Sequence, residues 1–238
     1  MRRLRGGAAA AVVLVFAVAG CKAETKAGSG GPEQTGGGGA ALTAAESLTV
    51  KGRAPKTGYS RERFGTAWAD TDSNSCDTRD DILKRDLDDV KFTGGTCKVS
   101  YGVLTSDPYS RKEVTYRRGR SLVDIDHLVA LSDAWQKGAK YWDAGKRIAL
   151  ANDPLNLLAV DASTNRSKGD GDTATWVPPN KAFRCTYVAG QVAVKKKYGL
   201  WVTGAEKAAM EKVLRTCPGQ KLPSGGNPTK APSRFHAG

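Results

Sequence analysis

Residues 123–129 read Val-Asp-Ile-Asp-His-Leu-Val, and this stretch carries the strongest indication of fold and function in the chain. Apolar β-branched residues alternate with acids up to His127, a pattern that is typical of a strand running into a loop. The only other histidine, His236, lies in a C-terminal segment rich in Pro, Gly, Ser and Lys. His127 is therefore the only histidine of the expected folded domain, and an imidazole is well suited to general-base chemistry near neutral pH.

Downstream of this stretch come a second strand and a short helix that carry further polar side chains. Asn156 stands near the start of an apolar strand expected over residues 155–161. Asn165 follows nine residues later, in a helix expected over residues 163–168. Lys168 lies one helical turn after Asn165, so the two side chains share one face of that helix. The order is thus a strand with Asp-His, a strand with Asn, and a helix with Asn and Lys.

This ordered set resembles the HNH, or ββα-metal, nuclease motif, and more closely the branch related to the C-terminal nuclease domain of GmrSD-type restriction enzymes. The phrases Asp-His-Leu-Val, Ala-Trp, Asn-Asp-Pro, Asn-Leu-Leu, Asn-x-x-Lys-Gly and Trp-x-Pro-Pro all occur between Asp126 and Pro179. The resemblance spans most of residues 59–217. It implies an α+β domain with a ββα-metal core and flanking helices, which hydrolyses nucleic acid, DNA in the first place, and leaves a 5′-phosphate.

The resemblance also implies a role for each polar residue of the set. Asp126 and Asn165 would ligate one divalent metal ion, and His127 would be the general base. Asn156 would fix the loop that holds His127, and Lys168 would meet a phosphate. Two oxygen ligands leave several waters on the metal, which favours Mg²⁺ or Mn²⁺ over Zn²⁺.

Two features of the pattern leave the metal site open. Many family members carry a histidine where Asn165 stands. In addition, Asp126 and His127 would point to opposite faces of a regular strand, so both reach one site only if the strand ends or bulges there. Asp124 shares the face of Asp126 and is an alternative ligand or a structural partner.

The charge of the chain is compatible with polyanionic partners. The 238 residues include 37 Lys and Arg against 24 Asp and Glu, a formal charge of +13, which becomes +10 once the three arginines of residues 1–20 are removed. Arg147 and Arg166 are candidates for contacts with a nucleic-acid backbone, whereas the run 195–197 of three lysines is expected to be a solvated helix face. The alternative function is a non-catalytic surface lipoprotein that binds an anionic polymer, and the sequence does not separate DNA from RNA.

The N-terminus is expected to be an export signal. Residues 1–20 combine three arginines, an apolar run and small residues before Cys21, as in a secretory signal peptide. Val18-Ala19-Gly20-Cys21 resembles a bacterial lipobox, which implies a lipid on the Cys21 sulfur and attachment to the outer face of the cytoplasmic membrane. An ordinary signal peptide is the alternative. We expect a flexible linker over 21–54, one monomeric domain over 55–217 and a disordered tail over 218–238.

Four cysteines remain for the folded domain, and an even number in an exported protein indicates disulfides. Four cysteines allow three pairings. We favour Cys76–Cys97 and Cys185–Cys217, because each pair joins segments that look like neighbours along the chain. A zinc site is disfavoured, because no two of the four are separated by only two to four residues.

The remaining elements follow from periodicity and from capping residues. We expect helices over 80–87, 132–150 and 181–198, a last helix that starts at Thr203 with a capping box, and strands over 97–104, 113–118 and 122–131.

Overall fold

The computed structural model describes residues 39–237, so the expected signal peptide and the lipid site at Cys21 lie outside the described residues. The described part combines helices with two small sheets, which confirms the α+β class. The α-helices are α1 (Ala40–Glu46), α2 (Thr78–Asp86), α3 (Leu131–Gln136), α4 (Ala144–Ala151), α5 (Ala162–Lys168), α6 (Arg184–Tyr198) and α7 (Gly204–Arg215). The strands are β1 (Asp88–Phe92), β2 (Val99–Leu104), β3 (Val114–Arg117), β4 (Val123–His127) and β5 (Leu157–Asp161). Short 3₁₀ turns are η1 (Arg61–Phe64), η2 (Ala139–Tyr141), η3 (Pro154–Asn156) and η4 (Lys181–Phe183).

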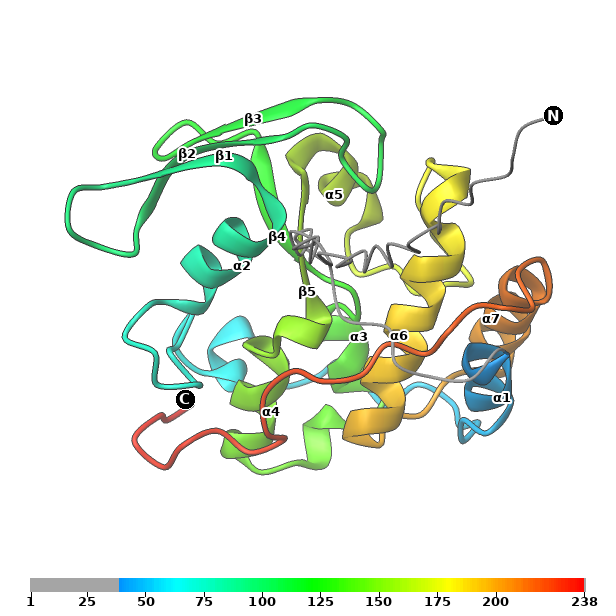
Figure 1. Ribbon diagram of the computed structural model, residues 1–238. Coiled ribbons are helices and arrows are strands. Elements are labelled where there is room, and N and C mark those ends of the chain that lie inside the picture. The colour runs from blue at the N-terminus through cyan, green and yellow to red at the C-terminus, as the bar shows by residue number, and fades with distance from the viewer. Residues whose placement is uncertain (1–38, 238) are drawn as a thin grey trace, which may run out of the picture.

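The centre of the molecule is the unit formed by β4, β5 and α5 (Figure 1). β4 pairs with β5 antiparallel, and His127 stands opposite Leu157. α5 begins directly after β5, because Asp161 ends the strand and its carboxylate accepts a hydrogen bond from the Thr164 amide at 2.8 Å. The expected order of strand, strand and helix is therefore present.

A second sheet, the antiparallel meander β1-β2-β3, lies beside this unit and shares a core with it. β1 was not expected from the sequence, because its residues Asp88 to Phe92 are mostly exposed and lack a clear apolar alternation. The disulfide Cys76–Cys97 joins the start of α2 to the turn before β2, and Cys185–Cys217 joins the start of α6 to the end of α7. Both expected pairings are thus confirmed.

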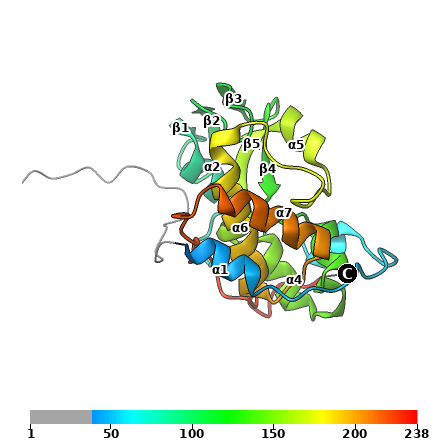
Figure 2. The same ribbon diagram turned by 90° about the vertical axis from the view of Figure 1, so that its right-hand side faces the viewer.

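The helices on the other side form a layer around α6. α1 and α7 pack on α6 and on each other, and Figures 1 and 2 show the three helices side by side. Ala41, Ala44 and Ala45 of α1 are buried. The folded part therefore begins near residue 40, within the range expected to be a linker. The short alanine face of α1 is enough to dock this helix, because it packs against buried apolar residues of α6 and α7.

Two further stretches differ from expectation. The helix expected over 132–150 is divided into α3, η2 and α4, and Gly138 at the first break has a φ of 134° that favours glycine. Residues 218–237 form no helix or strand, yet they are not a detached tail: Ala231 is buried, and Leu222 and Phe235 pack against the core. Segments of low complexity are thus ordered here by contacts that composition alone does not indicate.

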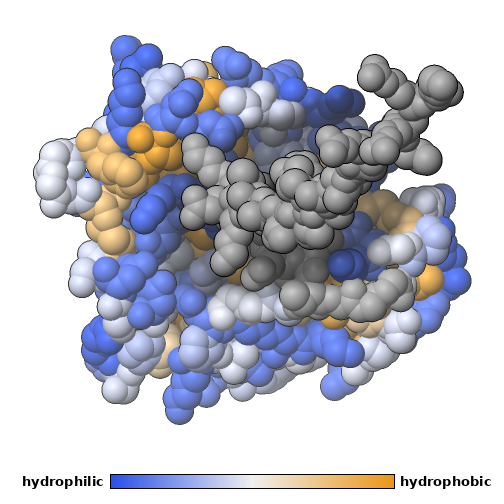
Figure 3. Space-filling view, in the orientation of Figure 1, coloured by the Kyte–Doolittle hydropathy of each residue, from blue (hydrophilic) through white to orange (hydrophobic). Residues whose placement is uncertain are grey.

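The surface of the described residues is mostly hydrophilic on the face shown in Figure 3, with smaller apolar patches between polar regions. None of the helices within residues 39–237 is both long enough and apolar enough to cross a membrane.

Candidate active site

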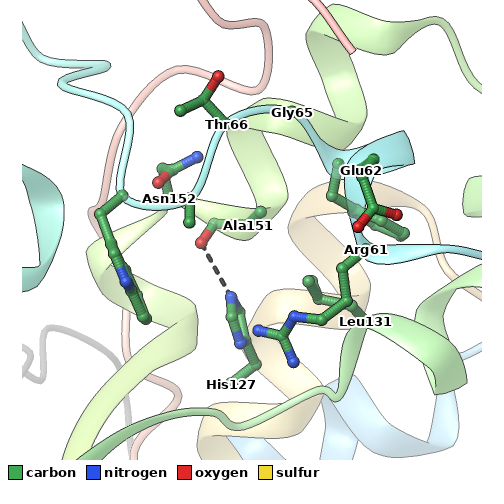
Figure 4. A pocket seen from close by; sticks show the side chains of 11 residues that line it. Arg61, Glu62, Gly65, Thr66, His127, Leu131, Ala151 and Asn152 are labelled. Atoms are coloured by element: carbon green, nitrogen blue, oxygen red, sulfur yellow. Dashed lines mark hydrogen bonds between the residues drawn. The ribbon is translucent and has the colours of Figure 1, made fainter. Parts of the chain in front are cut away.

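His127 ends β4 and is almost fully buried, with 7% of its surface exposed. Its Nε2 lies 2.9 Å from the carbonyl oxygen of Ala151, the last residue of α4 (Figure 4). A carbonyl only accepts hydrogen bonds, so Nε2 carries the proton. The neutral ring then has its lone pair on Nδ1, and this is the tautomer that a general base requires.

The surroundings keep this imidazole uncharged. Burial lowers the pKa of His127 to about 4, and the positive charges of Arg61 and Lys168 act in the same direction. The Ala151 carbonyl and the Asp126 carboxylate oppose the shift but do not overcome it. His127 is therefore in its proton-accepting form at neutral pH.

Asn156 holds the backbone on both sides of the histidine. The side chain is fully buried, and its Oδ1 accepts a hydrogen bond from the Val129 amide at 2.9 Å. Its Nδ2 donates to the carbonyl oxygens of Val129 and Leu150 at 3.4 and 3.3 Å. Val129 follows His127 by two residues, and Leu150 precedes Ala151. The Asn156 side-chain amide thus ties the loop after β4 to the end of α4 whose Ala151 carbonyl faces His127.

Asp126, the neighbour of His127, contacts a different set of elements. Its Oδ2 accepts a hydrogen bond of 2.6 Å from the Tyr109 hydroxyl, and its Oδ1 lies 2.9 Å from the ammonium of Lys168. Lys168 Nζ also donates to the His127 carbonyl oxygen at 2.7 Å. A buried carboxylate needs such partners, because an unpaired buried charge is costly. Lys168, which was expected to meet a phosphate, is thus paired with Asp126 in this structure.

Asn165 is paired with Asp124 and not with Asp126. Its Nδ2 donates to Asp124 Oδ2 at 3.2 Å. Asp124 and Asp126 lie two residues apart on one face of β4, and Asn165 and Lys168 lie one turn apart on α5. The four side chains therefore form two adjacent pairs across the β4–α5 interface, Asp124 with Asn165 and Asp126 with Lys168. Asp126 and Asn165, the two expected metal ligands, belong to different pairs and do not bond each other.

The donor chemistry of this interface fits a hard divalent cation. Asp124, Asp126 and Asn165 offer carboxylate and amide oxygens, the ligands that Mg²⁺ and Mn²⁺ prefer. No group of three or more His, Cys, Asp or Glu side chains in the described part of the chain gathers as a metal site. A cation here would have few protein ligands and would share or take over the Asp126 oxygen that now faces Lys168.

A cavity of about 360 Å³ opens on the His127 side of β4. Arg61, Trp68 and Leu131 are among the residues that line it, and the Trp68 ring stacks on the imidazole, with centroids 6.1 Å apart and planes 12° from parallel. Sequence reasoning missed Arg61, Trp68 and also Tyr109 as site residues. Arg61 and Trp68 lie before the Asp-His stretch in a region without recognisable pattern, and Tyr109 lies in the sequence Asp107-Pro-Tyr109, whose Pro indicates a turn but no chemical role.

The two expected backbone-binding arginines behave differently. Arg147 donates from Nε to the Arg63 carbonyl oxygen at 2.7 Å and also donates to the Trp142 carbonyl oxygen. Arg147 thus joins η1 to α4, a structural role beside which its expected contact with a polymer stays a prediction. Arg166 is exposed on α5 and has no hydrogen bond or ion pair to any residue from 39 to 237, so it is free to meet a phosphate backbone.

Comparison with known proteins shows the family to which the chain belongs. Residues 77–213, more than half of the chain, match the family described as GmrSD restriction endonucleases, C-terminal domain. An uncharacterized secreted protein of Arthroderma benhamiae is 41% identical over 172 residues, which are 71% of this chain and 81% of that protein. No solved structure matches the chain.

Proposed function

Because the chain belongs to the family of the C-terminal domain of GmrSD restriction endonucleases, we propose that it is a metal-dependent endonuclease that hydrolyses the phosphodiester bonds of DNA. The observation that carries this proposal is the state of His127: a neutral imidazole, oriented by the Ala151 carbonyl, beside a cavity. A buried histidine held in the base tautomer at the edge of a cavity is an arrangement suited to activating water.

In the proposed reaction, His127 Nδ1 takes a proton from a water molecule, and the water oxygen attacks the phosphorus. The bond from phosphorus to the 3′ oxygen breaks, which leaves a 5′-phosphate and a 3′-hydroxyl once the leaving oxygen gains a proton. Asn156 positions His127 through the backbone on either side of it. β4 ends at His127, and the phosphodiester would lie at this strand end, within reach of groups from both faces of the strand.

The proposed ligands of the cation are Asp126 and Asn165, with Asp124 as a third oxygen donor from the same interface. A bound Mg²⁺ or Mn²⁺ supplies positive charge to the phosphoryl oxygens during phosphodiester cleavage. Lys168 pairs with the Asp126 carboxylate and holds it in place at this interface. Arg166 adds an exposed positive charge for the polymer backbone.

We further propose that the protein acts outside the cytoplasmic membrane, as a monomer. The relative from Arthroderma benhamiae is described as secreted, and two disulfides hold the described domain, as in exported proteins. Residues 1–20 would be the signal peptide, and Cys21 would carry the lipid that anchors the domain.

The experiment that tests the proposed function is a plasmid-nicking assay on the oxidised mature chain. Supercoiled DNA is incubated with Mg²⁺, with Mn²⁺ and with a chelator, for the native chain and for His127→Ala. We expect nicking with either metal, none with the chelator and a loss of orders of magnitude in the variant. Intact plasmid in every metal, from protein shown to be folded, would reject the nuclease.

One observation favours the alternative, a non-catalytic module that binds anionic polymers. Both oxygens of Asp126 already have partners, which is the arrangement of a purely structural carboxylate. Such a module would bind DNA with a steep salt dependence, and His127→Ala would leave that binding unchanged.

A further inference from the structure

Positive charge is distributed unequally around the candidate site. Lys168 is turned into Asp126, and Arg147 is engaged by two carbonyl oxygens. Of the residues that line the His127 cavity, Arg61 is the only lysine or arginine. A phosphate that enters this cavity brings negative charge into partly apolar surroundings, so its binding requires a cationic group on the same side as the base.

The side chain of Arg61 is available for such a contact. It is exposed at the start of η1, and no residue between 39 and 237 gives its guanidinium a hydrogen bond or an ion pair. Figure 4 shows the guanidinium beside the imidazole of His127. The one carboxylate among the described residues that line the cavity, Glu62, lies apart from that ring in Figure 4, is fully exposed and accepts a hydrogen bond from Ser60.

The backbone that carries Arg61 is fixed with respect to His127. η1 packs on α4, where Phe64 is buried and Gly65 lies so close to Ile148 that an added Cβ would stand 2.6 Å from it. Arg147 of α4 also bonds the Arg63 carbonyl. The same helix presents the Ala151 carbonyl to His127. One element therefore positions both the arginine and the base.

We propose that Arg61 is the phosphate-binding residue of this site, where its planar guanidinium engages non-bridging oxygens of the phosphodiester next to His127 Nδ1. This proposal rests on the proposed nuclease function and assigns the residue that holds its substrate. A guanidinium fork matches two phosphate oxygens and reads no base, so it implies recognition of the backbone without sequence preference. Arg61 precedes the matched residues 77–213, so the site is completed by a segment outside the family match.

The test compares Arg61→Gln and Arg61→Lys with the matched control Arg63→Gln, an exposed arginine two residues away whose side chain does not line the cavity. With plasmid DNA and Mg²⁺, we expect Arg61→Gln to lower kcat/KM by roughly 10- to 100-fold, as for loss of a charge-assisted hydrogen bond. Arg61→Lys should retain an intermediate rate, since it keeps a point charge but loses the fork. Arg63→Gln should stay within about twofold of the native chain, as an exposed charge outside the site.

A binding measurement separates failure of this proposal from failure of the nuclease. Thymidine 3′,5′-bisphosphate is titrated in chelator against each chain by calorimetry, with the melting temperature as a check on folding. We expect the native chain and Arg63→Gln to bind it and Arg61→Gln to bind at least tenfold more weakly. Equal binding by all three would overturn the assignment of Arg61. If the native chain cleaves DNA and Arg61→Gln cleaves equally well, the nuclease stands and the role of Arg61 is rejected.

Discussion

Asp126 and His127 are adjacent in sequence, yet the two sides of β4 on which they lie are built in opposite ways. On the His127 side, a neutral imidazole faces a cavity beside Arg61, which has no hydrogen bond or ion pair within residues 39–237. On the Asp126 side, a buried carboxylate is enclosed by the Tyr109 hydroxyl and the Lys168 ammonium. Burial disfavours charge on both sides: it lowers the pKa of His127 despite the nearby Asp126 carboxylate, and Asp126 has the Lys168 ammonium as a buried partner.

The two sides of β4 therefore differ in the role that each can have at the end of the strand. Under the proposed function, the open side would carry out proton transfer and bind the phosphate, and the closed side holds a charged pair in a fixed position. Strand alternation separates the two neighbours, and β4 ends at His127, so a substrate at the strand end can reach both. A substitution on one side of β4 should leave the other side unchanged, so the other side serves as an internal control.

The largest effect is expected on the open side. His127→Ala should lower the nicking rate by about 10³-fold, because it removes the general base. The measurement is the initial rate of supercoiled-plasmid loss in Mg²⁺, with circular dichroism as a check that the fold is retained. A variant that still cleaves within tenfold of the native rate would place the base elsewhere.

On the closed side, the largest expected effect is on stability. Lys168→Met should lower the free energy of unfolding by about 3–5 kcal/mol, because it leaves Asp126 charged and buried without its ammonium. Urea denaturation of the oxidised protein measures this change. Arg166→Met, two residues away on the exposed face of α5, is the matched control and should change stability by less than about 0.5 kcal/mol.

The double variant Asp126→Asn, Lys168→Met tests whether this loss of stability comes from the unpaired Asp126 carboxylate. Removing both charges should recover most of the lost stability, since the cost lies in the unpaired carboxylate and not in the missing contact alone. Equal losses in the single and double variants would mean that Lys168 acts by packing.

The pH dependence should also differ between the sides. The folded-state pKa of His127 is about 4, against 6.5 in the unfolded chain, so the unfolded state binds the proton more readily. The contribution of this residue to stability is therefore complete above pH 6.5 and is lost as the pH falls toward 4, by up to about 3 kcal/mol. Urea titrations of the native chain and of His127→Gln across this window measure it. A slope that is the same in both chains would contradict the assignment.

The smallest of these effects is expected at the link between the two sides. Asn156→Ala should cost about 2 kcal/mol of unfolding free energy, because it leaves the Val129 amide and the carbonyl oxygens of Val129 and Leu150 without their side-chain partner. It should also lower kcat more than it raises KM, since it displaces the base and not the phosphate contact. A pure change in KM would show that Asn156 does not position His127.

The central unit was accessible from the sequence because its signals are local. The alternation in 123–127 and the spacing from Asn156 to Lys168 each lie within one element or between neighbours, and the paired cysteines join nearby segments. The Asp161 cap of α5 was not predicted. The loop-fixing role of Asn156 came from the resemblance alone and stays a prediction, beside its hydrogen bonds to Val129 and Leu150.

The partners of charged residues were not accessible in the same way. Helical spacing places Lys168 on the face of Asn165, but it does not tell which of several acids the lysine meets. Lys195 was expected in solvent and is instead fully buried between Asp133 and Glu206, at 3.1 and 3.0 Å. Arg61 reaches the site from a distant segment, through packing of η1 on α4 that no periodicity encodes.

The C-terminal segment described above has a consequence for how the protein can be shortened. The Ala231 amide donates to the Gly145 carbonyl at the start of α4, and the Asn227 side chain donates to the Asn152 carbonyl just past its end. Figure 1 shows this last stretch of chain running alongside α4. This segment thus holds both ends of α4, the helix that orients His127 and packs against η1. Proteolysis after Cys217 would therefore loosen the alignment of base and arginine while leaving both disulfides and every motif residue intact.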